Sequence, residues 1–80
     1  MQVDGEGIAL TSLKPSRDGK AYMVRLFNTA QEERTGVVRW NQARGKTWIS
    51  NPMEEAVEAA PPRIRLVPLE IVTLRVERKP

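Results

Sequence analysis

The 80-residue sequence contains no cysteine and no histidine. Without cysteine, the fold has no disulfide and no thiolate metal site. Without histidine, it lacks the commonest general base near neutral pH and the commonest zinc ligand. Any catalysis would have to depend on Asp, Glu, Lys, Ser, Thr or Tyr. We therefore expect no catalytic residue, metal ligand or cofactor site within this chain.

Long apolar runs are also missing. None approaches the roughly 18–20 residues of a membrane span, and the start MQVDGEG is too acidic and glycine-rich for a signal peptide. These features predict no membrane partner and a cytoplasmic location. There is no G-x-G-x-x-G, phosphate loop or calcium loop. The neighbouring carboxylates Glu32 and Glu33, or Glu54 and Glu55, do not face each other, so neither pair predicts an acid/base couple.

The charge is modest and mixed in sign. Thirteen Lys plus Arg against ten Asp plus Glu give a formal net charge of +3. An acidic segment, 51–60, separates two basic ones, 1–50 and 61–80. This order favours mutual screening over one phosphate-binding stripe, so we do not expect nucleic acid as a main partner.

What the sequence does contain is a series of short strand patterns. Eighty residues with 40% hydrophobic content predict a single globular domain, 1–80, with a thin core. Strand patterns separated by turns recur about every ten residues, which is typical of a β-sandwich or small barrel. The predicted strands are Ile8–Leu13, Ala21–Asn28, Thr35–Trp40, Lys46–Ser50, Arg63–Val67 and Glu70–Glu77. We predict an all-β fold, a small antiparallel immunoglobulin-like β-sandwich of about six to seven strands.

Three segments between the strands carry further signals. Asp18-Gly19 predicts a turn, because glycine adopts positive φ without steric cost. The segment 41–45 predicts another turn. The segment 52–60 favours helix by propensity, with Ser50 or Asn51 as a possible cap, but nine residues are too few for an independent helix. The contacts that this segment makes in the folded chain therefore decide whether it is helical.

The two longest predicted strands are apolar on both faces. In one, Tyr22, Val24 and Leu26 share a face, and in the other Val72, Leu74 and Val76 point inward. The opposite faces carry further apolar residues, whereas an outward strand face is usually more polar. We interpret this second face as a docking surface supplied by Met23, Arg25, Phe27, Ile71 and Arg75. The alternative is a small sandwich that exposes a few apolar side chains.

Two tryptophans flank a basic turn. Trp40 and Trp48 lie on either side of a segment that contains Arg44 and Lys46. Aromatic rings next to cations can stack on sugars or bases. Alternatively, both rings pack the thin core across one hairpin.

Two ordered motifs resemble a known family. Leu13-Lys14-Pro15, then Asp18-Gly19, then Val24-Arg25-Leu26-Phe27-Asn28 resembles the "LKP…DG…(V/L)RLYN" stretch near the end of the α-mannosidases of glycoside hydrolase family 38. The segment 66–76 is similar to that family's closing "L-x-P-x-E-I-x-T-L-R-(L/V)" strand, and 51–55 loosely matches its "T-N-L-L-E-E".

This resemblance implies a C-terminal β-sandwich domain of a longer enzyme. The family's catalytic aspartate and zinc ligands lie in a separate N-terminal α/β domain, and no position here matches them. The resemblance implies a parent that hydrolyses α-mannosides with zinc, and a domain that braces or docks on the catalytic domain in cis. The alternatives are a carbohydrate- or protein-binding module that uses Trp40 and Trp48, and a basic barrel that binds nucleic acid.

Overall fold

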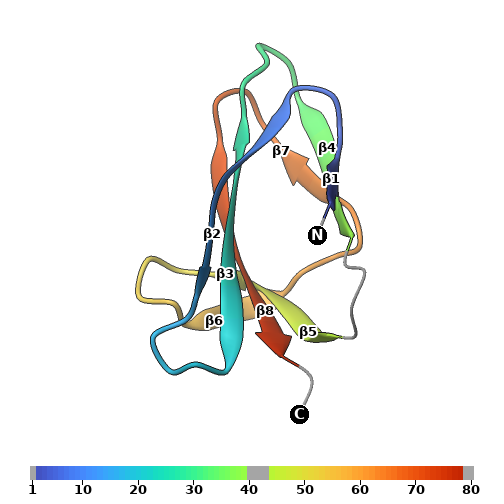
Figure 1. The fold of residues 1–80 in the computed structure, drawn as a ribbon. Coiled ribbons are helices and arrows are strands. Elements are labelled where there is room, and N and C mark those ends of the chain that lie inside the picture. The colour runs from blue at the N-terminus through green and yellow to red at the C-terminus, as the bar shows by residue number, and fades with distance from the viewer. Residues whose placement is uncertain (1, 40–43, 79–80) are drawn as a thin grey trace.

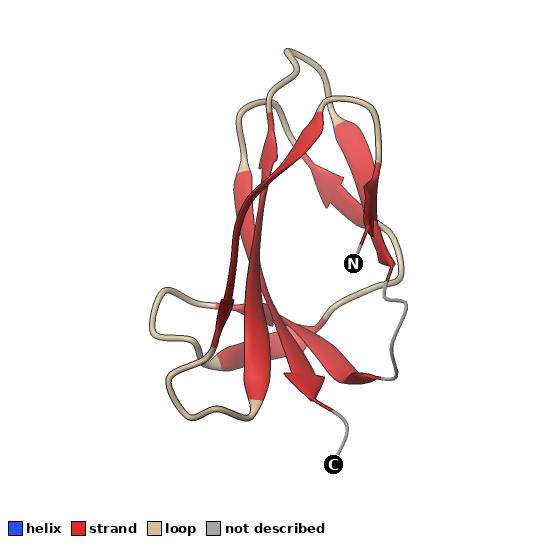
Figure 2. Cartoon of the chain, viewed as in Figure 1, coloured by secondary structure: helices blue, strands red, loops and turns tan. Residues whose placement is uncertain are grey.

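The computed structural model describes residues 2–39 and 44–78, and these form an all-β sandwich, as predicted (Figure 2). The strands are β1 (Gln2–Asp4), β2 (Ile8–Pro15), β3 (Ala21–Asn28), β4 (Arg34–Arg39), β5 (Arg44–Ser50), β6 (Ala56–Ala59), β7 (Ile64–Leu66) and β8 (Ile71–Arg78). The described residues form no helix, and so none that could cross a membrane. Two strands, β1 and β6, were not predicted, so the described part has more strands than expected.

The strands form two sheets in which every pair is antiparallel. The large sheet has the order β2-β3-β8-β5-β6, and the small sheet has the order β1-β4-β7. In Figure 1 the small sheet lies beside the upper part of β2, β3 and β8, and β5 and β6 cross below it. We call the face of the large sheet toward the small sheet the inner face, and the opposite one the outer face.

The core lies between the inner face and β7. The register sets Val24 of β3 opposite Leu74 of β8, and Tyr22 opposite Val76, as the alternating pattern predicts. The buried core cluster consists of Val24, Leu26, Ile64, Leu66, Leu74 and Val76. Half-buried neighbours such as Val72 and Val38 pack against it. Six side chains make a thin core, as the chain length leads one to expect.

The predicted turn at Asp18-Gly19 joins β2 to β3. Gly19 has a φ of 73°, and its N–H donates to the Ser16 carbonyl at 3.1 Å. The Ser16 amide donates to the Ala21 carbonyl at 2.9 Å, which closes the hairpin. The Asp18 carboxylate accepts from the Ser16 hydroxyl and the Lys20 amide inside this turn.

The helical propensity of 52–60 is not realised. The Asn51 side-chain oxygen accepts the N–H groups of Met53 and Glu55, and Glu54 has a φ of 66°, which ends any helical path. The chain then pairs as β6 with β5. The sheet ladder satisfies more backbone groups than a single isolated helical turn can, so tertiary context overrides propensity. Of the predicted turn 41–45, residues 41–43 lie outside the described part.

A buried asparagine ties the upper ends of the strands together. Asn28 is fully buried, and its Nδ2 donates to the carbonyls of Glu32, Leu66 and Val67 at 2.8, 3.0 and 3.1 Å. Its Oδ1 accepts the Ala30 N–H at 2.9 Å. One side chain thus satisfies backbone groups of the β3–β4 loop and of the end of β7. Asn28 closes the motif that carries the family resemblance, and its role is structural.

The β7–β8 connection is a tight turn. The Glu70 N–H donates to the Val67 carbonyl at 3.1 Å, and the Val67 N–H donates to Glu70 Oε1 at 2.9 Å. Pro68 precedes Leu69, whose φ is 61°. Proline followed by a residue with positive φ is the pattern of a type II turn, in which glycine or asparagine normally takes the second position.

Candidate functional surfaces

The outer face brings together all five side chains predicted to form a docking surface. Strand register sets Phe27 opposite Ile71, and Met23 opposite Arg75. Arg25 lies between these two rows, opposite Thr73. The predicted set is therefore one continuous strip along β3 and β8. Its two ends differ in what covers them.

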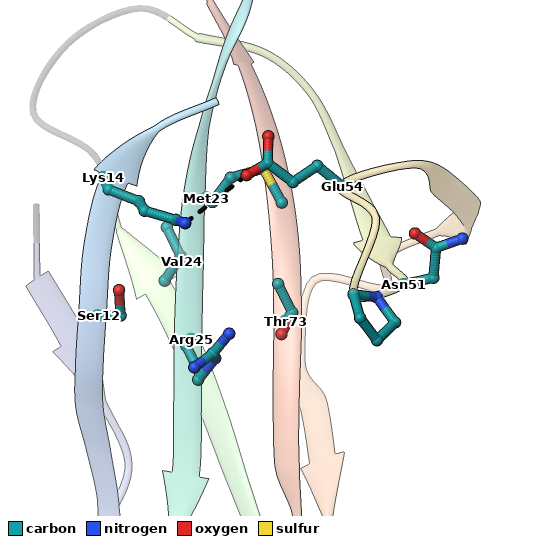
Figure 3. A pocket seen from close by; sticks show the side chains of 9 residues that line it. Ser12, Lys14, Met23, Val24, Arg25, Asn51, Glu54 and Thr73 are labelled. Atoms are coloured by element: carbon teal, nitrogen blue, oxygen red, sulfur yellow. Dashed lines mark ion pairs between the residues drawn. The ribbon is translucent and has the colours of Figure 1, made fainter. Parts of the chain in front are cut away.

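We call the end with Met23 and Arg75 the covered half. Met23 is 3% exposed although it lies opposite the core, and the Arg75 side chain is 12% exposed. The β5–β6 turn lies over them and encloses a cavity of about 40 Å³, which Asn51, Pro52 and Glu54 line together with Met23 (Figure 3). This half of the predicted docking surface is thus occupied by the chain's own turn.

Ionic contacts hold the β5–β6 turn against the outer face. The Glu54 side chain, 11% exposed, accepts the Arg17 N–H at 2.8 Å, and its Oε2 lies 3.7 Å from Lys14 Nζ (Figure 3). Arg75 donates to the Glu54 carbonyl at 3.3 Å and to Asp18 Oδ2 at 2.8 Å. The turn after β5 is thereby clamped to the β2–β3 hairpin across the outer face.

Asp18 is the titratable group that this clamp changes most clearly. The Ser16 hydroxyl, the Lys20 amide and Arg75 all donate hydrogen bonds to the Asp18 carboxylate. These bonds, of which the one from Ser16 contributes most, hold the pKa of the Asp18 carboxyl well below its usual range. A carboxylate that stays charged and hydrogen-bonded at neutral pH is a poor general acid. Its contacts give it a structural role.

We call the end with Phe27 and Ile71 the bare half; Arg25 lies at its border and also lines the cavity beneath the β5–β6 turn. Ile71 is 59% exposed, and Phe27 is half-buried. Exposed Leu69 precedes Ile71 across the β7–β8 turn. The Arg25 guanidinium is exposed and makes no ion pair or side-chain hydrogen bond with the residues that the structure describes. Arg25, Phe27 and Ile71 thus remain candidates for docking, and Leu69 was missed because it lies in a turn, outside the strand alternation.

Of the two tryptophans that the sequence analysis singled out, only Trp48 lies among the described residues. Trp40 lies outside the described residues. Trp48 is half-buried on the outer face opposite Arg75, so the alternative that it packs in the core is wrong. Its Nε1–H donates to Glu77 Oε1 at 3.1 Å, and Lys46 Nζ lies 5.9 Å from its ring centroid.

An open hollow surrounds Trp48. We call it the tryptophan hollow; it is about 640 Å³ in volume and is lined by Gly19, Lys20, Gly45, Lys46, Trp48, Glu77 and Arg78. Three of these side chains are cationic and one is a carboxylate. The sequence pointed to Trp48 and Lys46 but not to Lys20, Glu77 and Arg78, which only the strand pairing brings alongside.

The described residues offer no metal centre. Across 2–39 and 44–78, no group of three or more metal-ligating side chains comes together.

Comparisons with known proteins agree with the motifs. The model of the family described as "Glycosyl hydrolases family 38 C-terminal beta sandwich domain" matches residues 7–74. A Halalkalibacterium halodurans protein named "Putative mannosylglycerate hydrolase" is 35% identical over 79 residues, which cover 95% of this chain. The chain spans only 9% of the length of that relative. No solved structure matches the chain.

Proposed function

Because the chain belongs to the C-terminal β-sandwich domains of glycosyl hydrolase family 38, we propose that it is a non-catalytic module of a larger glycoside hydrolase. Its role is to brace the parent by docking on the catalytic domain. The partner is thus in cis, and the relative, of which the chain spans 9%, supports a much longer parent.

The bare half of the outer face is the observation that carries this proposal. Ile71 and Phe27 form an apolar pair that no described segment covers fully, beside Arg25, which has no acidic partner among the described residues. Arginine suits interfaces because its planar fork pairs with carboxylates while its stem covers apolar surface. The matching surface on the catalytic domain would be apolar with an acidic rim.

The parent is proposed to hydrolyse α-linked mannosides, with mannosylglycerate as one candidate substrate because the H. halodurans relative carries that name. The catalytic groups and the family's zinc would belong to the catalytic domain. Hydrolysis of an aryl α-mannoside and of mannosylglycerate by the full-length parent tests the substrate. The isolated 80-residue chain should hydrolyse neither, and turnover by it would refute the non-catalytic role.

Docking is tested in the full-length parent with Ile71→Asp. A fully buried apolar side chain contributes about 1.5–3 kcal/mol, so the substitution should lower the temperature of thermal inactivation. Val57→Asp is the matched control, because Val57 is equally exposed but lies on edge strand β6. In the isolated chain both substitutions should change the free energy of unfolding by no more than about 0.5 kcal/mol. Equal effects of the two variants on the parent would refute docking through the bare half.

A further inference from the structure

The basic side chains that the structure describes divide into two groups. Six ion pairs engage Lys14, Arg17, Arg34, Arg39, Arg65 and Arg75 with carboxylates. Among the side chains that the structure describes, those without a carboxylate partner are Lys20, Arg25, Lys46, Arg63 and Arg78. Three of these five line the tryptophan hollow, although they come from the β2–β3 turn, β5 and β8. Unpaired positive charge is therefore concentrated at one hollow.

The arginine of this group is held in place. Arg78 Nη2 donates to the Tyr22 hydroxyl at 2.8 Å and Nη1 to the Gly19 carbonyl at 3.3 Å, with the guanidinium 4.8 Å from the Tyr22 ring centroid. These contacts leave other guanidinium N–H groups available, since arginine has five donors. A positioned guanidinium loses less side-chain entropy when it binds an anion.

The remaining lining groups suit a sugar ring. Trp48 offers an aromatic surface, and its indole N–H is already satisfied by Glu77. That bond uses one Glu77 oxygen, and the other can accept a hydroxyl hydrogen. The hollow of about 640 Å³ lies within the roughly 300–1,000 Å³ typical of small-molecule sites.

We propose that the tryptophan hollow binds an anionic saccharide. The sugar ring packs on Trp48, a hydroxyl donates to Glu77, and the acidic group of the ligand, a carboxylate or a phosphate, binds Lys20 and Lys46, with Arg78 at the edge of the hollow. A nucleic acid is a weaker fit, because the described lining of the hollow has one aromatic side chain, Trp48, and carries the carboxylate of Glu77. This site does not depend on the docking proposal, since Ile71 and Phe27 do not line it.

The test is an NMR titration of the 80-residue chain, in which the Trp48 indole N–H signal is followed after assignment with Trp40→Phe. Signal dispersion first establishes that each variant is folded. Glucuronate and mannose 6-phosphate are the carboxylate and phosphate probes, and methyl α-mannoside is the neutral one. At least one acidic sugar should shift the Trp48 signal with at least about tenfold higher affinity than methyl α-mannoside, because charge-assisted hydrogen bonds are the strong ones.

Substitutions inside and outside the tryptophan hollow test whether the acidic sugar binds there. Replacing both Lys20 and Lys46 by Gln should weaken binding of the acidic sugar at least about tenfold and leave methyl α-mannoside binding unchanged. Arg63→Gln removes an unpaired cation outside the hollow and should change affinity less than about twofold. If Arg63→Gln weakens binding as much as the double lysine substitution, the effect is one of net charge, and the site is overturned.

Four other results would also overturn the proposal. They are no shift with any sugar, equal affinity for methyl α-mannoside and the acidic sugars, equal affinity for inorganic phosphate and mannose 6-phosphate, and tighter, strongly salt-dependent binding of an oligothymidylate. The last two would indicate a simple anion site and a nucleic-acid surface, respectively.

Discussion

The two halves of the outer face have similar sequence patterns but different environments. In each half an apolar side chain neighbours an arginine: Met23 lies opposite Arg75, and Phe27 follows Arg25 on the same face of β3. Over Met23 and Arg75 the chain places its own β5–β6 turn, held by Glu54 and Asp18. Over Ile71 no described segment provides comparable cover. Apolar residues on both faces of a strand therefore have two causes here, an intramolecular cover and a surface left for a partner.

The largest expected effect tests this difference directly in the isolated chain. Met23→Ala removes a buried side chain and should lower the free energy of unfolding by about 2–5 kcal/mol, with the lower end favoured if the turn collapses into the space. Ile71→Ala, a similar truncation on the same face, should change it by no more than about 0.5 kcal/mol. Urea unfolding followed by circular dichroism measures both. Equal losses would show that the two halves do not differ.

The second prediction concerns the polar contacts beneath the bare half. Asn28→Ala leaves three carbonyls and one N–H without their side-chain partner, and should lower the free energy of unfolding by roughly 1–3 kcal/mol. Thr29→Ala, which removes a hydroxyl bonded to the Gly7 carbonyl at an exposed position, should cost less. Hydrogen exchange should locate the loss at the β3–β4 loop and the β7–β8 turn. A uniform loss over all strands would contradict this localised role.

Much of the fold could be predicted from the sequence because strands and turns are recognised from short local sequence patterns. Period-two alternation assigned the inward faces of β3 and β8, and Asp18-Gly19 marked a turn whose glycine does need positive φ. The segment 52–60 could not be assigned from propensity. Its structure depends on the Asn51 side chain and on pairing with β5, and neither is visible in residue preferences.

The candidate surfaces could be predicted only in part. Alternation placed the five docking candidates on one face, but it could not show that the β5–β6 turn, distant in sequence from both residues, covers Met23 and Arg75. The cations of the tryptophan hollow come from three separate segments, so no spacing rule would group Lys20 with Arg78. Long-range placement of loops and strand neighbours is the missing information in both cases.

A smaller effect is expected at the turn that borders the bare half. Leu69 has a φ of 61°, a conformation that costs a non-glycine residue roughly 1–2 kcal/mol. Leu69→Gly relieves this strain but makes the unfolded chain more flexible, so a net gain of at most about 1 kcal/mol is expected in the isolated chain. Leu69→Ala keeps the strain and should bring no gain. If Leu69 belongs to the docking surface, Leu69→Gly should destabilise the full-length parent, which would extend the bare half beyond Ile71.

The smallest effect on stability is expected from Asp18, which forms the exposed part of the contacts that hold the β5–β6 turn over the covered half. This effect depends on pH. The Ser16 hydroxyl, the Lys20 amide and Arg75 lower the pKa of the folded Asp18 carboxyl below its ordinary value of 3.8. Because the pKa of Asp18 is lower in the folded chain than in the unfolded chain, its charge stabilises the fold fully above the unfolded-state pKa. This stabilisation is lost as the pH falls through the folded-state pKa.

Between about pH 5 and pH 2 the native chain should therefore lose stability faster than Asp18→Asn, which keeps an oxygen acceptor for Ser16 and Lys20 but has no charge to titrate. The difference should shrink in high salt, because Asp18 is accessible to solvent. Urea unfolding at a series of pH values measures both curves. Parallel curves would show that the Asp18 charge does not help to clamp the turn over Met23 and Arg75.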